Sequence, residues 1–185
     1  MKKIFVLAFG SLLFISCNNN DKDAGKKNDE APAVAAADTK TQDAEFADAK
    51  YVAMGKKALA SMSSGDIDGW VSNYADNAVY FWNSGDSVSG KAAITAYWKK
   101  RRTEVIDSIS FSSDIWLPVK VNKPQAPEQA PGVWLLGWYK INAKYKTGKS
   151  MIQWSHIDYH FDANDKIDRV IQYLDKAPIN AATTK

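Results

Sequence analysis

The hydrophobic pattern of this 185-residue chain changes its period once, near residue 105. Before that point apolar residues recur at helical spacing, and after it they alternate with polar residues, as on strands. Helices followed by long antiparallel strands predict an α+β fold in which one face of a single sheet packs on the helices. The predicted helices are 45–62, 66–74 and 90–98, and the predicted long strands are 108–121, 133–145, 150–161 and 167–175.

Turn-forming residues divide these elements. Asp66 is placed to cap the second helix. Residues 78–82 predict a short aromatic strand, which an Asn-Ser-Gly-Asp turn connects to a brief antiparallel strand at 87–88. The segment 123–132 holds three prolines, so it is predicted to be a loop.

The N-terminus has the features of a targeting segment. Lys2 and Lys3 precede a short apolar run, and the sequence Phe-Ile-Ser-Cys at 14–17 resembles a bacterial lipobox. We therefore expect a lipoprotein signal peptide over 1–16 and lipidation of Cys17, with an ordinary secretory signal as the alternative. Cys17 is the only cysteine, which excludes a disulfide framework and a cysteine metal site.

The polar, alanine-rich segment 17–44 predicts a disordered tether, followed by one domain over 45–180 and a tail over 181–185. The whole chain carries a net charge of +3, and loss of the two signal-peptide lysines leaves +1. A charge this small gives no electrostatic reason to expect a nucleic-acid partner. The expected location is the bacterial cell envelope, with a lipid anchor and either a periplasmic or a surface-exposed domain.

Four short motifs carry a family resemblance. They are Gly65-Asp66, Tyr74-Ala75-Asp76-Asn77-Ala78, Gly90-Lys91 with Ala93-Ile94, and Phe161-Asp162 with Lys166-Ile167. The region from Glu45 to Pro178 resembles the SnoaL-like branch of the nuclear-transport-factor-2-like (NTF2-like) superfamily. The resemblance implies a cone-shaped, curved antiparallel or mixed sheet around three N-terminal helices, a pocket inside it, and usually a homodimer. It does not fix a function, because the family includes isomerases, cyclases, hydrolases and binding modules.

The resemblance also locates the catalytic positions of the ketosteroid isomerases. Trp82 stands where that group has its base, Ala58 where it has its oxyanion-hole tyrosine, and Ile157 where it has its neutral carboxylic acid. None of these side chains supplies the chemistry needed for proton abstraction and enolate stabilisation. We therefore expect no isomerase of this kind and lean toward a protein that is not an enzyme.

Three polar residues on one predicted strand are the remaining catalytic candidates. His156, Asp158 and His160 alternate along the strand, so their side chains share a face and could bind a metal ion or perform acid–base chemistry. Their parity places them on the outer face, away from the helices, which favours a polar edge of an interface instead. We expect neither a metal nor a cofactor.

Inward-facing aromatic and polar residues suit a pocket for a flat or apolar ligand, although they could equally fill a solid core. The candidate pocket residues are Trp70, Tyr74, Trp82, Tyr97, Trp98, Tyr139, Gln153, Ser155, Tyr159 and Gln172.

The opposite face of the sheet is also apolar. We expect a homodimer to cover it, with the proline-rich loop as the alternative cover. The residues of this expected interface are Trp134, Leu136, Trp138, Ile152 and Trp154.

Three functions fit these observations. The leading one is an anchored, non-catalytic domain that binds a small apolar or aromatic ligand or a partner. The others are a SnoaL-like enzyme that uses His156, Asp158 or another polar group of the pocket, and a structural dimer with no open pocket.

Overall fold

The computed structural model describes residues 41–184. The predicted signal peptide (1–16), the lipidation of Cys17 and most of the predicted tether (17–44) lie outside the described residues. Within the described part of the chain, no helix has the length and apolar character needed to cross a membrane.

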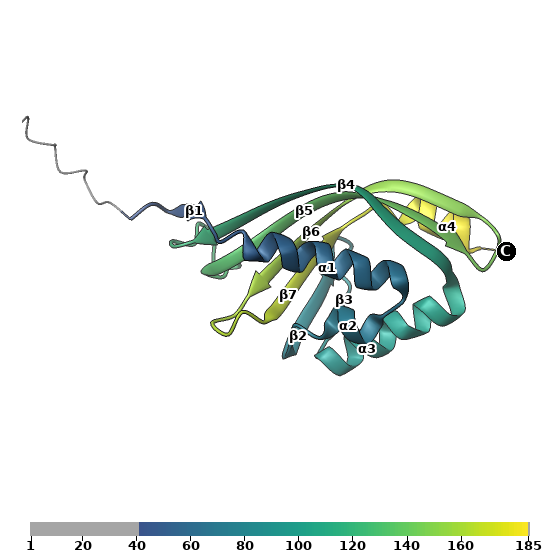
Figure 1. Ribbon diagram of the computed structural model, residues 1–185, viewed down its shortest axis with the longest axis horizontal. Coiled ribbons are helices and arrows are strands. Elements are labelled where there is room, and N and C mark those ends of the chain that lie inside the picture. Colours follow the sequence, from purple (N-terminus) through teal and green to yellow (C-terminus); the bar gives the residue numbers. More distant parts are fainter. Residues whose placement is uncertain (1–40, 185) are drawn as a thin grey trace, which may run out of the picture. The chain divides into compact units, whose positions relative to one another are not determined.

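One seven-stranded sheet and four α-helices make up the described domain (Figure 1). The elements are β1 (Ala44–Phe46), α1 (Lys50–Ser64), α2 (Ile67–Val71), β2 (Tyr74–Trp82), β3 (Ser87–Ser89), α3 (Lys91–Lys100), a π-helical turn (Arg101–Val105), β4 (Ile106–Val121), β5 (Gly132–Tyr145), β6 (Ser150–Phe161), β7 (Ile167–Tyr173) and α4 (Lys176–Thr183).

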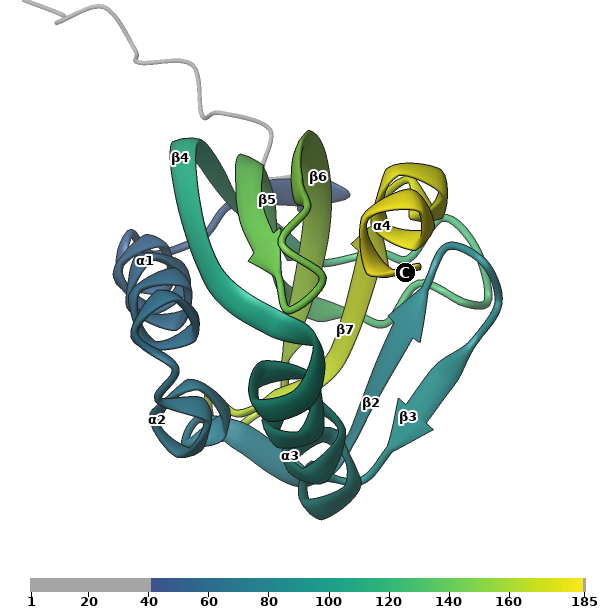
Figure 2. The ribbon, with the colours of Figure 1, turned by 90° about the vertical axis from the view of Figure 1, so that its right-hand side faces the viewer.

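The strand order in the sheet is β1-β4-β5-β6-β7-β2-β3. Only the β2–β7 pair is parallel, so the sheet is mixed. The sheet curves, and α1, α2 and α3 lie together on its inner side (Figure 2). This arrangement confirms the predicted α+β fold with a curved mixed sheet around three N-terminal helices.

The alternation along β5 separates the two faces of the sheet as predicted. Leu135, Tyr139, Ile141 and Ala143 face the helices and are buried. The charged side chains at the end of β5 point the other way, and Lys144 is exposed. The alternation of apolar and polar residues determines which β5 side chains face the helices, because successive strand side chains must point to opposite faces.

The first helix is shorter than its pattern predicts. Residues Ala44–Phe46 form a strand that pairs with β4, and Phe46 is 79% exposed rather than part of a helix face. The helix begins at Lys50, whose backbone N–H donates to the Asp48 carboxylate at 2.7 Å. The prediction that the helix starts near 45 is therefore wrong, because the chain first pairs with the sheet edge.

The second helix ends at Val71 rather than 74, and two later boundaries also differ from the prediction. β2 begins at Tyr74 rather than 78, because the backbone pairs with β7 from Tyr74 onward across a bulge. The last strand ends at Tyr173, and the fourth helix, α4, was not predicted. The carboxylate of Asp175 caps α4 by accepting from the Ala177 N–H at 2.8 Å. Because α4 extends to Thr183, most of the segment 181–185 belongs to a helix rather than a tail.

Candidate functional site: an aromatic cavity between helices and sheet

A cavity of about 450 Å³ lies between the helices and the curved inner face of the sheet. Apolar side chains from α1, β4, β5 and β6 supply much of its wall; they include Leu59, Met62, Ile109, Ile141 and Ile157. The inner face therefore does not close into a solid core. A volume of this size is within the range of sites for small organic molecules.

Five aromatic rings line one side of the cavity and support one another. Trp70 of α2 and Tyr97 of α3 each meet Trp98 edge to face, with ring centroids 5.5 Å apart. Tyr97 is 5.2 Å from Trp82, and Trp82 is 4.7 Å from Tyr80 on the same strand. Edge-to-face and tilted contacts of this kind stabilise aromatic clusters beyond simple burial, so the rings form a stiff wall.

A chain of hydrogen bonds runs behind the aromatic wall. The Tyr80 hydroxyl donates to Gln172 Oε1 at 2.5 Å, and the Gln172 amide donates to Ser155 Oγ at 3.4 Å. The Ser155 hydroxyl in turn donates to the backbone carbonyl of Tyr173 at 3.0 Å. Gln172 lies opposite Trp82 and Ile157 on the neighbouring strands, so strand pairing places its amide against the cavity.

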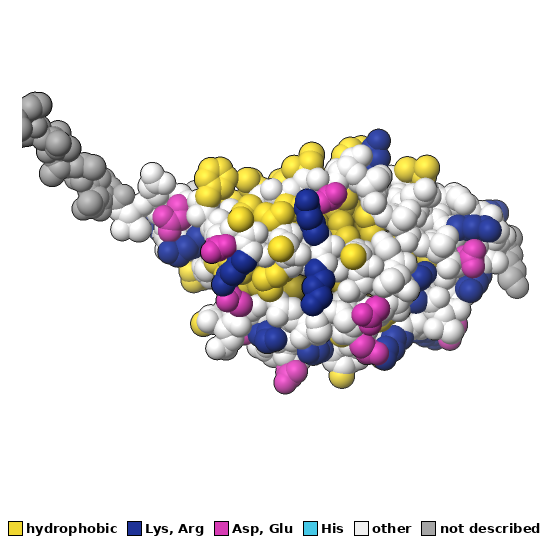
Figure 3. All heavy atoms as spheres, viewed as in Figure 1, with side chains coloured by type: hydrophobic (Ala, Val, Ile, Leu, Met, Phe, Trp, Pro, Cys, Tyr) yellow, Lys and Arg dark blue, Asp and Glu magenta, His cyan; other side chains and the backbone are white. Residues whose placement is uncertain are grey.

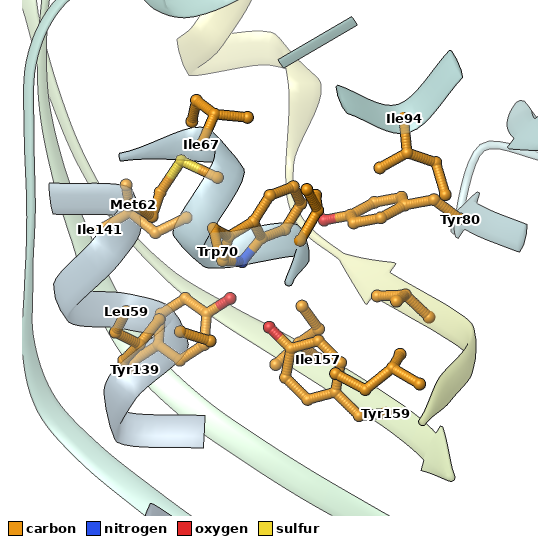
Figure 4. Close-up of a cluster of buried hydrophobic side chains, with 14 of the residues drawn as sticks. Leu59, Met62, Ile67, Trp70, Tyr80, Ile94, Tyr139, Ile141, Ile157 and Tyr159 are labelled. Carbon is orange, nitrogen blue, oxygen red and sulfur yellow. The ribbon is translucent and has the colours of Figure 1, made fainter. Parts of the chain in front are cut away.

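Burial keeps the inner tyrosines in their neutral form. It raises the pKa of Tyr74, Tyr80, Tyr139 and Tyr159 well above the ordinary value. Neighbouring tyrosines raise the pKa of Tyr74, Tyr80 and Tyr139 further. The indole N–H of Trp70 partly opposes the rise at Tyr159. Figure 4 shows that the hydroxyls of Tyr139 and Tyr159 and the indole nitrogen of Trp70 point toward a common space. These hydroxyls can donate hydrogen bonds, but they are poor bases.

The mouth of the cavity is polar and is bordered by α4. Asp86 of the β2–β3 turn, Ser87 of β3, and Lys176 and Asn180 of α4 line it. Lys176 Nζ lies 2.5 Å from the Asp86 carboxylate, and this contact holds the pKa of Asp86 below its usual value. The far end of α4 is held at the β5–β6 turn, where the Thr147 hydroxyl donates to the Ala182 carbonyl at 2.6 Å. The unpredicted helix thus spans between two sides of the mouth.

Most of the candidate pocket residues lie on the cavity wall, but three do not. The residues on the wall are Trp70, Trp82, Tyr97, Trp98, Tyr139, Tyr159 and Gln172. Tyr74 is fully enclosed in the core, and Ser155 lies one layer behind the wall, bonded to Gln172 and Tyr173. Gln153 binds the backbone of Asp175 before α4, so its side chain is used in fixing that connection. Its placement in the pocket is therefore wrong, although its strand parity is right.

Sequence reasoning missed several wall residues. Tyr80 has the same strand parity as Trp82 and could have been found from alternation alone. Leu174 shares the parity of Gln172 within the predicted strand 167–175 and could have been found in the same way, whereas Ile179 lines the cavity only through the unpredicted helix α4. Among the positions that correspond to isomerase catalytic residues, Trp82 and Ile157 lie on the wall, whereas Ala58 is buried in α1 away from it.

The three polar candidates of β6 are on the outer face of the sheet, away from the cavity. His156 stacks on Trp138, with ring centroids 4.5 Å apart, and its Nε2 lies 2.8 Å from Asp158 Oδ1. Burial raises the pKa of Asp158, and His156 opposes the rise. Among the residues that the structure describes, no group of three or more His, Cys, Asp or Glu side chains is arranged to hold a metal ion.

His160 has a different environment and is buried. Its Nδ1 lies 2.5 Å from the Asp168 carboxylate and its Nε2 lies 3.0 Å from the Pro131 carbonyl, which fastens the proline-rich loop to β6. The ring also packs on Trp134, whose indole N–H donates to the Ala130 carbonyl at 2.9 Å. The loop therefore covers Trp134, which is only 9% exposed, and the expectation that Trp134 lies in an interface is wrong.

The rest of the outer face is open. Ile115, Ile152, Trp154 and Tyr173 are between 43% and 68% exposed, and Leu136 and Trp138 lie half-buried between them. In the view of Figure 3, charged side chains of both signs are scattered over the surface, while hydrophobic side chains gather beside α1 and along the upper edge of the sheet.

Comparison with known proteins identifies the architecture. No family model matches the sequence, and no curated protein matches it. A proposed polyketide cyclase from Xanthomonas campestris pv. campestris has a similar structure, with a TM-score of 0.57 and 14% identity over 72% of this chain and 96% of the other. The domain has the NTF2-like fold.

Two further structures support this NTF2-like assignment. A proposed isomerase from Bacillus subtilis has a TM-score of 0.56 and 18% identity over 72% of this chain and 91% of the other. An NTF2-like protein of unknown function from Burkholderia pseudomallei K96243 has a TM-score of 0.57 and 12% identity over 72% and 97%. These three matches confirm the NTF2-like fold of the domain.

Proposed function

We propose that this SnoaL-like domain binds a small apolar or aromatic ligand in the cavity and performs no reaction on it. The observation that carries the proposal is the chemistry of the wall. Among the described residues that line the cavity, no histidine occurs and the one carboxylate is Asp86, at the mouth and paired with Lys176. The inner hydroxyls belong to tyrosines that burial keeps protonated.

Proton abstraction requires a base whose pKa lies near the working pH. A tyrosine whose pKa is raised far above neutrality donates a hydrogen bond but does not accept a substrate proton. A cavity with stiff aromatic walls and neutral donors therefore favours binding of an intact molecule. Burial of a two-ring aromatic ligand against these walls supplies several kcal/mol, at about 25 cal/mol per Å² of apolar surface removed from water.

A neutral fluorescent probe tests this proposal. N-phenyl-1-naphthylamine should bind the purified protein saturably, with a rise in its emission. Ile109→Trp enlarges a side chain on the cavity wall and should weaken binding by about tenfold or more. Ile152→Trp makes a matched change on the exposed outer face and should leave binding unchanged. Absence of saturable binding, or equal binding by the two variants, would contradict a ligand cavity.

We also propose that two copies of the domain pair through the open part of the outer sheet face. All five large hydrophobic side chains that are exposed in the described residues lie on strands at outward-facing positions: Phe46, Ile115, Ile152, Trp154 and Tyr173. Exposure of this many large apolar side chains on one sheet face favours an interaction surface. A second copy supplies the same apolar surface, and a two-fold contact pairs one patch with its own copy.

Sedimentation of the Trp154→Glu variant tests this pairing. We expect the wild type to sediment as a dimer and Trp154→Glu as a folded monomer, because a charge at a half-exposed position is tolerated in the monomer but not in an apolar contact. Ala60→Glu places the same charge on the exposed side of α1 and should leave the dimer intact. A monomeric wild type, or a Trp154→Glu dimer, would refute this interface.

The proposed location is the cell envelope, with the domain held by lipidated Cys17. The supporting observation is the sequence of residues 1–17, a basic start, an apolar run and one cysteine. In the host bacterium, Cys17→Ser should abolish the acyl mass on the mature protein and release the domain from the membrane fraction. A wild-type protein without acyl mass would contradict the anchor.

A further inference from the structure

We propose that the mouth of the cavity holds an anion-binding site, in which Arg101 binds the carboxylate of an amphipathic ligand whose aromatic body lies in the cavity. Arg101 lies at the C-terminal end of α3, is half-buried and lines the cavity. The site rests on the proposed binding function and narrows the ligand to an aromatic monocarboxylate.

Arg101 belongs to a run of four basic residues, 99–102, and is the member directed to the cavity. Lys99 and Lys100 each contact a carboxylate outside the cavity, at 2.7 Å and 3.9 Å. Arg102 packs at the end of α1, where a Cβ atom built on Gly65 would lie 3.3 Å from its Nη2. Arg101 forms no ion pair with any residue that the structure describes, so its charge is available to a ligand.

Helix periodicity directs Arg101 to the aromatic wall. It follows Tyr97 by four residues, so the two side chains share one face of the helix. The guanidinium carbon lies 5.8 Å from the centre of the Tyr97 ring, and the Tyr97 ring lies 5.2 Å from that of Trp82. A ligand ring that packs on Trp82 and Tyr97 therefore lies close to the guanidinium, and a substituent on that ring can contact it.

Tyr145, the last residue of β5, supplies a second donor beside Arg101. Burial raises the pKa of the Tyr145 hydroxyl, and the positive charge of Arg101 opposes the rise. The hydroxyl therefore stays protonated at neutral pH and can donate a hydrogen bond. The turn that follows Tyr145 holds the far end of α4, so this site lies across the mouth from the pair of Lys176 and Asp86.

The charges of the cavity favour a ligand with one negative charge. The charged side chains that line it are Arg101, Lys176 and Asp86. Lys176 and Asp86 neutralise each other, which leaves one positive charge at Arg101. A carboxylate matches this charge and the planar N–H pair of a guanidinium, whereas a phosphate dianion brings one charge too many. Because Arg101 is only half-buried, a carboxylate bound there keeps part of its hydration, which reduces the cost of binding an anion.

Two naphthalene probes of nearly equal size and shape test the site. 2-Naphthoate carries the carboxylate, and 2-naphthamide is its neutral, planar counterpart. Isothermal titration calorimetry at neutral pH and fixed ionic strength gives their affinities for the wild type, Arg101→Gln, Arg101→Lys and Lys100→Gln. Lys100→Gln is the matched control, because it removes the same charge from the neighbouring residue, whose side chain is 72% exposed and lies outside the cavity.

The measured quantity is the affinity for 2-naphthoate divided by the affinity for 2-naphthamide. We expect the wild type to prefer 2-naphthoate, and Arg101→Gln to lower the ratio about tenfold, because it removes a charge-assisted hydrogen bond. Arg101→Lys keeps the charge but loses the planar N–H pair, so it should lower the ratio about threefold. Lys100→Gln should leave the ratio unchanged. If Arg101→Gln does not fold, the fall expected for Arg101→Lys decides in the same way.

Different failures identify different errors. If both probes bind the wild type but the Arg101 variants keep its ratio, or if the wild type prefers the amide, the anion site is wrong and the binding function stands. An equal fall in Lys100→Gln would show a general attraction by the basic run and would also overturn the site. If neither probe binds the wild type, the proposed binding function fails and this inference fails with it.

Discussion

Replacing Gly137 of β5 with alanine should destabilise the domain through one contact. A Cβ atom built on Gly137 would lie 2.3 Å from Cζ3 and 2.7 Å from Cε3 of Trp116 on the adjacent strand β4. Real Cβ atoms do not approach other heavy atoms so closely, so the indole would have to move. It has no room on the other side, because a Cβ on Gly55 of α1 would also lie 2.9 Å from Trp116.

The size of the effect follows from two opposing contributions. Alanine restricts the unfolded chain more than glycine does, which stabilises the fold by about 0.4–1 kcal/mol where the backbone permits it. Forcing a large ring out of a tightly packed position costs about 1–3 kcal/mol. The steric cost is larger, so we expect Gly137→Ala to lower the free energy of unfolding by about 1–2 kcal/mol, which corresponds to a fall in Tm of about 3–8 °C.

A double-mutant cycle with Trp116→Phe tests the reasoning. Phenylalanine lacks the outer indole atoms that meet the new methyl group, so in that background Gly137→Ala should become neutral or stabilising. Urea unfolding followed by circular dichroism gives the four free energies, and the two residues should show a coupling of about 1–3 kcal/mol. An equal cost of Gly137→Ala in both backgrounds would refute the contact as the cause.

Two further predictions concern the outer face of the sheet. Burial raises the pKa of Asp158 in the folded state above its value in the unfolded state. The buried ionised carboxylate therefore lowers the free energy of unfolding at high pH, and this loss disappears as the pH falls and Asp158 takes up a proton. The unfolding free energy of Asp158→Asn minus that of the wild type should therefore rise with pH once the pH exceeds the ordinary pKa of an aspartate, about 4, and a flat difference would contradict this. His160→Phe leaves the Asp168 carboxylate and the Pro131 carbonyl without their hydrogen-bond partner. It should lower the free energy of unfolding in urea by about 1–3 kcal/mol and speed proteolysis within 123–131. Unchanged cleavage would show that the loop is held by other contacts.

The sequence predicted which residues share a face better than it predicted what they contact. Alternation places Tyr139, Ser155 and Tyr159 on the inner face, because side-chain direction in a strand is set by the backbone alone. Their roles depend on neighbours from other strands: Ser155 bonds the Tyr173 carbonyl behind the wall, while Tyr139 and Tyr159 reach the cavity. Cross-strand register brings these neighbours together, and alternation within one strand does not determine it.

Helix α4 was not predicted although the sequence has a capping signal for its start, because the preceding strand pattern was extended as far as Asp175. Asp175 is a favourable capping residue, and Pro178 is tolerated in a first helical turn. Only Ala182 of this helix is fully buried, so its apolar pattern is weak. Its position is fixed by Asp86 and Thr147, which are distant in the sequence and which no local pattern reveals.

Whether the aromatic residues enclose a cavity or fill a core depends on the curvature of the sheet. β4 bends at a bulge between Ser112 and Ile115, where Ser113 adopts a positive φ of 56°. A bulge adds one unpaired residue to one strand and turns that strand away from its partner, and β4 curves over the helices in this way (Figure 1). A flat sheet would meet α1 and α3 along its whole width and leave no internal space. The curved sheet touches α1 closely where Trp116 lies between Gly55 and Gly137, and beyond that contact the wall recedes to leave the cavity that Tyr139 and Tyr159 line.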